Sequence, residues 1–268
     1  MGAWHLPAVV VLSLAVSACA GSMHRLPLIS QEDVLHASDE IAAAPDLHTV
    51  RRTSGQNQAL VQRAAQRLQN AVFALCNQTG HSPCRFEVVF DPSDEVNAYA
   101  SGTDRIVIYE GLVKYLKTED EVAAVIAHEM GHHIAGHIDK SQVNAGAGAL
   151  VSAILYTAIM AAATGGDVDP SVFNSGLDSS VQLGAAVGQL SYSKEHEREA
   201  DYIAAYLLAR AGYDLDRARG LWVQLTKSSG NMHTDMFDTH PSGPDRLAAW
   251  DIAVAEVETS DDLLPEMK

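Results

Sequence analysis

The chain has 268 residues, and 47% of them are hydrophobic, so it can bury a core and is not a disordered chain. Its 34 acidic residues outnumber 18 basic ones and give a formal net charge of −16. That charge argues against nucleic acid and against an anionic bilayer as electrostatic partners.

The first twenty residues, MGAWHLPAVVVLSLAVSACA, contain an apolar run that ends in small residues and Cys19. This pattern resembles a bacterial lipoprotein signal, in which cleavage before the cysteine leaves it to be acylated. No Lys or Arg precedes the run, so a plain secretory signal or a short membrane anchor remains an alternative. The absence of Asp after Cys19 favours, by the same resemblance, the outer membrane. We therefore expect a signal at 1–18 and a tether with an N-terminal segment at 19–54.

Apolar residues recur every three and four positions from Gln56 to Cys76, which predicts an amphipathic helix. Cys76 and Cys84 bracket the turn-like sequence NQTGHSP between this helix and a predicted strand. In an exported protein we expect the two cysteines to form a disulfide, with free buried thiols as the alternative.

Short β-branched or aromatic runs follow at 85–90, 96–100 and 105–109, and SGTD between the last two predicts a hairpin turn. Thr118 is followed three positions later by Glu121, which is the pattern of a capping box. We therefore expect a helix that begins just after Thr118 and carries the sequence AAVIAHEMGHHIAGH.

The stretch at 145–163 carries no charge and is long enough to cross a bilayer. Because it is rich in Ala and Gly, we expect a helix packed on the domain or lying at a membrane surface, with a membrane span as the alternative. The Gly/Ser-rich segment 165–188 predicts a mobile loop, and a helix returns from Lys194. The compact domain is expected at 55–250, followed by a solvated acidic tail at 251–268.

HEMGH places His128 and His132 one helical turn apart on the same helix face. Two imidazoles so arranged can bind one zinc ion, and the carboxylate of Glu129 between them can polarise a metal-bound water. A catalytic zinc also needs a third protein ligand and a position open to water.

The third ligand is sought in the downstream sequence SYSKEHEREADYIAAYLLARAG. Helical phase places Glu197 and Asp201 on the apolar face of this helix. Glu195 and Glu199 fall on its polar side. Because an unpaired carboxylate is costly inside a protein, we assign Glu197 as the third ligand and Asp201 as the group that orients a ligand histidine. Without the histidine pair, two buried carboxylates paired with an arginine such as Arg246 would be the preferred interpretation.

Four blocks, in the order VNAYASGTDRIVIYEGL, HEMGHHIAGH, SYSKEHEREAD and THPSGPDR, resemble metallopeptidase family M48, the gluzincins that include the CaaX prenyl protease, HtpX and periplasmic lipoprotein proteases. The resemblance implies a mostly helical α+β fold with a zincin-like core, in which the edge strand of a small sheet flanks the H-E-x-x-H helix. It also implies one Zn²⁺ per chain, a general base and an orienting aspartate, at these positions: ligands His128, His132 and Glu197, base Glu129, and Asp201.

The remaining polar residues have less specific patterns. His133 and His137 lack a glutamate between them, and we expect His137 to have a structural hydrogen-bonding role. His240 could be a resting-state zinc ligand, a hydrogen-bond donor to the tetrahedral intermediate, or a cap of the next helix. Arg246 is a further candidate for the oxyanion or resting-state role.

VNAYA resembles the edge strand of the family, and an unpaired edge can accept an extended peptide as an added strand. We expect Asn97, Ala98 and Tyr99 to line this substrate strand, with Asn97 clamping the peptide backbone. An ordinary hairpin is the alternative.

These patterns together predict a zinc metalloendopeptidase of the bacterial cell envelope, lipid-anchored through Cys19 at the outer membrane and facing the periplasm. Its expected partners are unfolded or misassembled envelope proteins, the membrane that holds the lipid and, as a further candidate, the outer-membrane assembly machinery. Two alternatives remain open. One is a zinc-bound periplasmic holdase for outer-membrane proteins with little proteolysis, and the other is an inner-membrane protease that spans the bilayer through 145–163.

Overall fold

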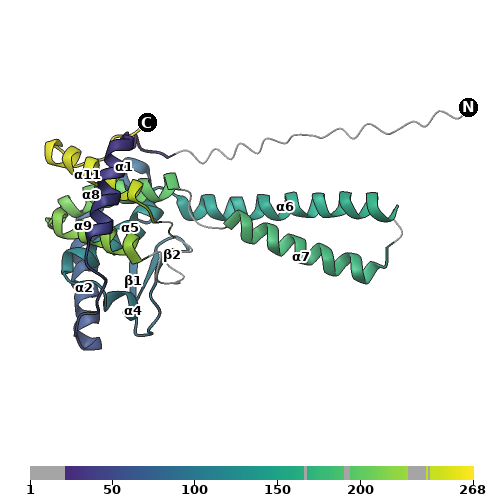
Figure 1. Cartoon of the computed structure of the whole chain (residues 1–268), viewed down its shortest axis with the longest axis horizontal. Helices are drawn as coiled ribbons and strands as arrows, with labels where there is room; N and C mark the ends of the chain where they lie inside the picture. Colours follow the sequence, from purple (N-terminus) through teal and green to yellow (C-terminus); the bar gives the residue numbers. More distant parts are fainter. Residues whose placement is uncertain (1–21, 166–167, 190–193, 229–239, 241) are drawn as a thin grey trace, which may run out of the picture.

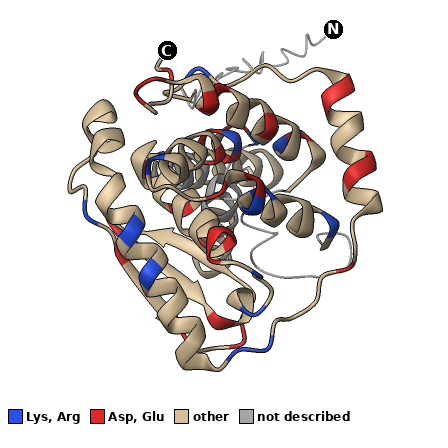
Figure 2. Ribbon diagram, turned by 90° about the vertical axis from the view of Figure 1, so that its left-hand side faces the viewer, with Lys and Arg blue, Asp and Glu red and all other residues tan. Residues whose placement is uncertain are grey.

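The computed structural model describes residues 22–165, 168–189, 194–228, 240 and 242–268 (Figure 1). The predicted signal and Cys19 lie outside the described residues. The described chain is mostly helical with a small mixed sheet, as the sequence predicts. In Figure 2, which faces the end of the domain opposite the arm of α6 and α7, acidic and basic residues are distributed over several helices.

In the sequence, the strands come after the first described helices and before the remaining ones. They are α1 (Gln31–Ala43), α2 (Ser54–Ala71), α3 (Phe73–Thr79), β1 (Glu87–Asp91), β2 (Ala98–Ser101), β3 (Arg105–Tyr109), α4 (Glu110–Val113), α5 (Glu119–Ile134), α6 (His137–Thr164), α7 (Pro170–Gln189), α8 (Lys194–Arg210), α9 (Leu215–Ser228) and α11 (Pro244–Thr259).

The sheet has the strand order β1-β3-β2, so β3 is central and β2 lies at an edge. β1 runs parallel to β3, whereas β2 and β3 form the antiparallel hairpin predicted from SGTD. α5 packs against β2 and β3. The Nε2 atom of His133 on α5 lies 3.1 Å from the carbonyl oxygen of Arg105, so it donates a hydrogen bond that fixes the helix to the start of β3. The predicted edge strand therefore flanks the H-E-x-x-H helix.

α5 is the central helix of the domain, and its start is set by the predicted capping box. The Thr118 hydroxyl accepts a hydrogen bond from the backbone N–H of Glu121 at 3.1 Å, and the Glu121 carboxylate accepts one from the N–H of Thr118 at 3.3 Å. All residues of α5 from 120 to 134 are buried. The helix ends before Gly136, whose positive φ of 67° turns the chain into α6.

Gly131, inside the HEMGH sequence, allows α5 and α8 to approach each other closely. A Cβ atom at this position would lie 2.7 Å from the carbonyl oxygen of Ala200 on α8 and 3.0 Å from its Cα atom. No rotamer change can relieve a contact with backbone atoms. The glycine therefore sets the distance between the two helices that carry the candidate site.

The first described residues and the C-terminal residues pack on the domain and on each other. The backbone N–H of Arg25 donates to the carbonyl of Glu266 at 2.8 Å, and that of Lys268 donates to the carbonyl of Met23 at 3.1 Å. α1 packs against α9 and α11. The described part of the predicted tether and N-terminal segment, residues 22–54, thus contains α1 and packs on the domain.

The predicted solvated tail at 251–268 is instead partly packed on the domain. α11 continues to Thr259 and buries Ala253 and Val257, because these residues lie on the face of α11 that meets the core. The domain therefore extends beyond the predicted limits of 55–250. Local sequence patterns could not predict this packing of the last residues, because they pair with Met23 and Arg25, more than 200 positions away in the chain.

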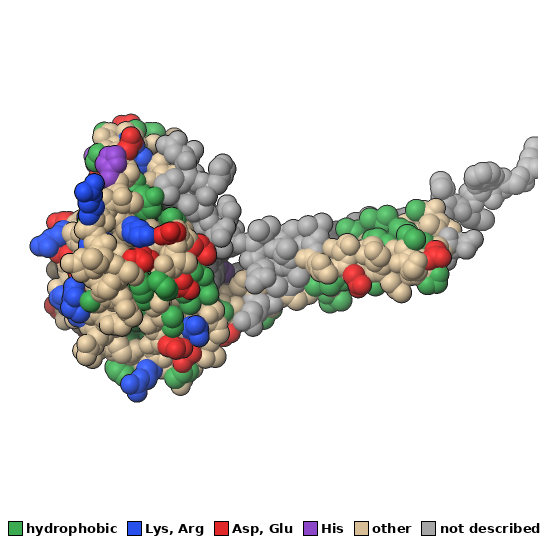
Figure 3. Space-filling model, turned by 90° about the horizontal axis from the view of Figure 1, so that it is seen from below, with side chains coloured by type: hydrophobic (Ala, Val, Ile, Leu, Met, Phe, Trp, Pro, Cys, Tyr) green, Lys and Arg blue, Asp and Glu red, His purple; other side chains and the backbone are tan. Residues whose placement is uncertain are grey.

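α6 and α7 form an antiparallel helical arm that projects from the domain (Figures 1 and 3). The predicted mobile loop at 165–188 is wrong, because most of it forms α7, which packs along α6. The rings of Tyr156 and Phe173 lie 5.6 Å apart across this contact. α6 packs mainly on α7 and not on the body of the domain, and its exposed side chains include Leu150 and Ile154. None of the described helices has the length and apolarity needed to cross a membrane.

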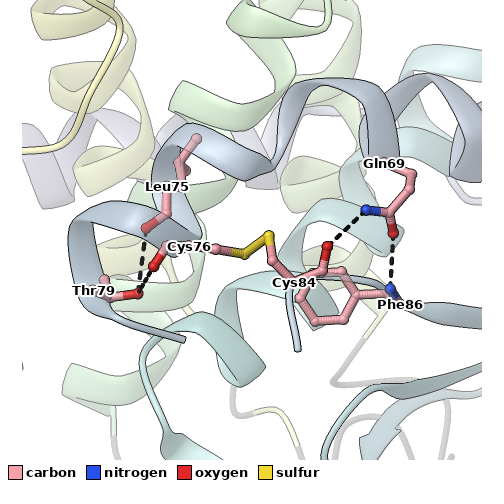
Figure 4. The surroundings of a disulfide bond; sticks show 6 residues. All are labelled: Gln69, Leu75, Cys76, Thr79, Cys84 and Phe86. Atoms are coloured by element: carbon pink, nitrogen blue, oxygen red, sulfur yellow. Dashed lines mark hydrogen bonds between the residues drawn. A yellow bond between two sulfur atoms is a disulfide. The ribbon is translucent and has the colours of Figure 1, made fainter. Parts of the chain in front are cut away.

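A disulfide joins Cys76 in the middle of α3 to Cys84, which precedes β1, with the two Cα atoms 5.8 Å apart (Figure 4). The expected pairing is therefore present. The side-chain amide of Gln69 donates to the carbonyl of Cys84 at 3.1 Å and accepts from the N–H of Phe86 at 2.8 Å, so α2 holds the same segment a second time.

The close contact of α5 and α8 predicts an asymmetric response to two glycine substitutions. Gly131→Ala should lower the free energy of unfolding by about 1–3 kcal/mol, because the added methyl group meets backbone. Gly146→Ala on α6 meets nothing within 4 Å and should raise it by about 0.5–1 kcal/mol. Urea denaturation measures both. Equal stability of the Gly131→Ala variant and the wild type would contradict the described contact.

Candidate active site

Three side chains predicted as zinc ligands converge between α5 and α8. The Nε2 atoms of His128 and His132 lie 3.0 Å apart. The Oε2 atom of Glu197 lies 3.3 Å from Nε2 of His128, and its Oε1 atom lies 3.4 Å from Nε2 of His132. All three residues are buried. Glu197, the carboxylate that the helical-phase argument selects on α8, therefore lies beside the histidine pair.

His240 reaches the same cluster from the segment that precedes α11. Its Nδ1 atom lies 3.1 Å from Oε1 of Glu197 and 3.3 Å from Nε2 of His128. Gly243 is the N-cap residue of α11 and no side chain caps that helix, so the prediction of His240 as its cap is wrong. The position of the imidazole among the other donor atoms agrees with the resting-state ligand.

The spacing of the four donor groups fits a zinc ion. Their ligand atoms all lie within 4.8 Å of one another, and the separations given above run from 3.0 to 3.4 Å. A tetrahedral zinc with bonds of about 2.0–2.1 Å has ligand atoms about 3.3 Å apart. Imidazole nitrogen and carboxylate oxygen are also the donor types that zinc prefers. These residues could therefore hold one Zn²⁺.

Glu129 is the second observation that fits a metal site. Its side chain is fully buried, and neither carboxylate oxygen has a hydrogen-bond partner among the residues that the structure describes. The Nε2 atom of His240 is 3.6 Å from its Oε1 atom, which is beyond hydrogen-bond length. A buried carboxylate in this state is costly unless a donor is supplied. A water held at the adjacent donor cluster would be such a donor.

Asp201 and Arg246 form hydrogen bonds or ion pairs with two of the candidate ligands, His128 and Glu197. The Oδ1 atom of Asp201 lies 2.8 Å from Nδ1 of His128, so this nitrogen carries a proton and the ring is held with Nε2 facing the cluster. The guanidinium of Arg246 donates to Oδ2 of Asp201 at 2.7 Å and lies 2.8 Å from Oε2 of Glu197. The carboxylate pair with arginine, which was the alternative to a metal site, is thus present together with the histidines.

Burial and neighbouring charges set the protonation of the candidate ligands. Burial opposes the charge of Glu197, but the electrostatic effect of the neighbouring His240 and Arg246 side chains outweighs it and holds the pKa of Glu197 well below its ordinary value. Burial lowers the pKa of His132 well below its ordinary value. An ionised carboxylate and a neutral imidazole are the forms that bind metal.

His128 differs from His132, because the hydrogen bond and charge of Asp201 outweigh burial and raise its pKa to about 10. A metal at its Nε2 atom would have to displace that proton.

The chain of hydrogen bonds that begins at Nδ1 of His132 was not predicted from the sequence. Nδ1 of His132 lies 3.0 Å from Nδ1 of His137, and Nε2 of His137 lies 2.9 Å from Oε2 of Glu199. The predicted structural role of His137 agrees with these contacts. The prediction that Glu199 lies on the polar side of α8 is wrong, because the side chain is fully buried and accepts hydrogen bonds from the backbone N–H groups of Met23 and His24. Local spacing could not reveal this, since the covering segment is about 175 residues away in the chain.

The predicted substrate strand lies next to α5. The side chain of Asn97 is engaged locally, because it donates to Glu95 at 3.2 Å and accepts from the N–H of Ala98 at 2.8 Å. Ala98 is buried, and the half-buried ring of Tyr99 lies 6.1 Å from that of Tyr109. A role of these residues in peptide binding stays a prediction.

Comparison with known proteins places this geometry in a family context. The sequence profile described as Peptidase family M48 matches residues 58–253. The chain is 34% identical over 161 residues to the mitochondrial metalloendopeptidase OMA1 of Arabidopsis thaliana, which covers 60% of this chain and 30% of that protein. It is 32% identical over 183 residues to the metalloprotease LoiP of Escherichia coli K12, which covers 68% of this chain and 67% of LoiP.

A further relative is the beta-barrel assembly-enhancing protease of Escherichia coli O157:H7, with 30% identity over 169 residues. The match covers 58% of this chain and 32% of that relative. The chain thus spans about a third of the length of the Arabidopsis and O157:H7 proteins and about two thirds of the length of LoiP.

The donor cluster predicts that two glutamates of α8 differ sharply in zinc binding. Glu197→Ala removes a donor atom and should weaken zinc binding by about 100-fold or more, because mutating even a residue that only supports a metal ligand lowers metal affinity by about 10–100-fold. Glu195→Ala, two residues earlier and exposed, should leave the zinc Kd unchanged. Zinc stoichiometry and Kd are measured by competition with a chromogenic chelator. Equal zinc affinity of the two variants would reject Glu197 as a ligand.

Proposed function

The chain belongs to peptidase family M48, and from this membership and the site geometry we propose that it is a zinc-dependent metalloendopeptidase, a hydrolase of peptide bonds. One observation carries the proposal. Three imidazoles and one carboxylate have the spacing of a zinc tetrahedron, and they lie beside the buried carboxylate of Glu129, which has no hydrogen-bond partner among the described residues. A purely structural zinc site would not need Glu129.

The proposed mechanism assigns a task to each residue of the site. Zinc, when bound to His128, His132 and Glu197, would polarise water and the scissile carbonyl as a Lewis acid. The Glu129 carboxylate would accept a proton from the attacking water and then donate it to the leaving nitrogen of the peptide. Asp201 would hold the His128 ring with Nε2 facing inward.

His240 would control access to this site. A catalytic zinc keeps one position open to water, and the Nδ1 atom of His240 lies where a fourth donor would be. We propose that His240 is a resting-state ligand that moves away before a substrate is cleaved.

The proposed substrates are unfolded or misassembled proteins of the bacterial cell envelope, which makes the role one of protein quality control. β2 at the edge of the sheet supports this, because an extended peptide can add to a free edge by backbone hydrogen bonds that do not depend on side chains. The relatives named LoiP and beta-barrel assembly-enhancing protease support it further and suggest the outer-membrane assembly machinery as a partner.

We also propose that Cys19 carries a lipid that anchors the domain at the outer membrane, facing the periplasm. Only Ala20 and Gly21 separate Cys19 from Ser22. Because three Cα steps span at most about 11 Å, such an anchor would hold the N-terminal side of the domain close to the membrane surface.

Glu129→Gln tests the enzymatic proposal directly. The variant should bind zinc like the wild type, because Glu129 is not among the donor groups, but cleave casein about 100-fold more slowly or worse, since it cannot accept a proton. Protease and holdase are separated by adding an unfolded β-barrel client: the wild type should yield fragments that a chelator abolishes. Full casein cleavage by Glu129→Gln would reject the base, and protection from aggregation without fragments would favour the holdase.

Cys19→Ser tests the anchor. Wild-type protein should sediment with the membrane fraction of cells, and the variant should be recovered in the soluble periplasmic fraction because it cannot be acylated. Casein cleavage by the purified variant serves as the control for folding. Retention of the Cys19→Ser variant in the membrane fraction would show that another part of the chain binds the membrane.

A further inference from the structure

We infer that His24, together with the backbone of Met23, is a positioning element of the metal centre that acts on His132 through Glu199 and His137. The segment that would link the lipid anchor to the domain is thus also the segment that orients a zinc ligand. The inference rests on the proposed function, because it takes His132 as a ligand.

The contacts run without a gap from the metal ligand to the N-terminal segment. Nδ1 of His132 meets Nδ1 of His137 at 3.0 Å, and Nε2 of His137 meets Oε2 of Glu199 at 2.9 Å. The other oxygen of Glu199, Oε1, lies 2.8 Å from Nδ1 of His24. All four side chains are fully buried.

Donors and acceptors along this chain can be assigned in one consistent way. A carboxylate accepts, so Nε2 of His137 carries a proton and donates it to Glu199. Neutral His137 then has a lone pair on Nδ1, which accepts from Nδ1–H of His132. His132 is thereby held in the tautomer whose Nε2 lone pair faces the donor cluster, which is the form that binds zinc.

Glu199 keeps its charge in this buried place because donors surround it. It accepts from Nε2 of His137, from Nδ1 of His24, and from the backbone N–H groups of Met23 and His24 at 2.6 and 3.0 Å. Three of these four donors belong to the N-terminal segment. Loss of that segment would leave a buried carboxylate short of partners, and its hold on His137 would weaken.

The segment itself is held in place at both sides. Its backbone pairs with that of Glu266 and Lys268 at the C-terminus. The amide and hydroxyl of Ser22 donate to Oε1 of Glu195 at 3.1 and 3.0 Å. Glu195 therefore binds the same segment without contacting the histidines, and it offers a matched control for general loosening of the N-terminus.

The test measures the zinc Kd of the full-length chain by chelator competition for the wild type and four variants. His24→Ala and Glu199→Gln should each raise the Kd about tenfold, the low end of the range for groups that support metal ligands. His24→Asn should stay within about twofold of the wild type, because its amide N–H can replace Nδ1–H toward Glu199. Glu195→Gln should also stay within about twofold.

A spectroscopic readout separates orientation of the ligand from loss of fold. The visible absorption of the Co²⁺-loaded protein should change in His24→Ala and Glu199→Gln and match the wild type in His24→Asn and Glu195→Gln. Circular dichroism of the metal-free variants checks folding. Glu199→Gln keeps the buried volume, so it carries the test if His24→Ala does not fold.

The inference is overturned if His24→Ala and Glu199→Gln bind zinc as tightly as the wild type, or if Glu195→Gln weakens zinc as much as they do. Zinc binding and casein cleavage by the wild type would then still support the proposed function. A wild-type chain that binds no zinc would reject the proposed function and this inference together.

Discussion

The backbone contact between α5 and α8 at Gly131 and Ala200 is the constraint on which the candidate site depends. α5 carries two of the four donor groups, His128 and His132, and α8 carries a third, Glu197, so neither helix alone supplies a complete zinc site. A glycine within a helix costs about 1 kcal/mol relative to alanine. That cost is offset here because only a residue without Cβ lets Glu197 come within 3.4 Å of both histidines. The arm formed by α6 and α7 lies between the two helices in sequence and leaves their contact intact.

The balance of buried charges, like the spacing of the donor atoms, favours a bound cation at the site. Four carboxylates are buried in and around the site, and Arg246 is the one arginine or lysine side chain buried with them among the described residues. Arg246 compensates the charge of Asp201 and part of that of Glu197. The N-terminal segment and His137 surround Glu199 with donors, whereas Glu129 has no hydrogen-bond partner in the described structure. A divalent cation at the histidine cluster would supply the charge that the protein itself lacks.

The sequence predicted those features that depend on neighbours along the chain. The capping box set the start of α5, the spacing of HEMGH put two imidazoles on one face, and the phase of α8 pointed Glu197 inward, because each follows from helix geometry over a few residues. The same reasoning failed for Glu199. A phase argument assumes that a helix has one covered face, but α8 is covered by α5 on one side and by residues 22–24 on another. The C-terminal residues were missed for the same reason, because residues 23–25 order them. α7 was missed because its Gly- and Ser-rich sequence is held in a helix by packing along α6, the preceding helix.

The central claim is that one zinc ion occupies the point where α5 and α8 meet, and anomalous X-ray diffraction at the zinc absorption edge tests it most directly. The account predicts one strong anomalous peak per chain, about 2.0–2.2 Å from the Nε2 atoms of His128 and His132 and from a carboxylate oxygen of Glu197. A zinc-loaded crystal whose anomalous peak lies elsewhere, or beyond bonding distance of Glu197, would contradict it.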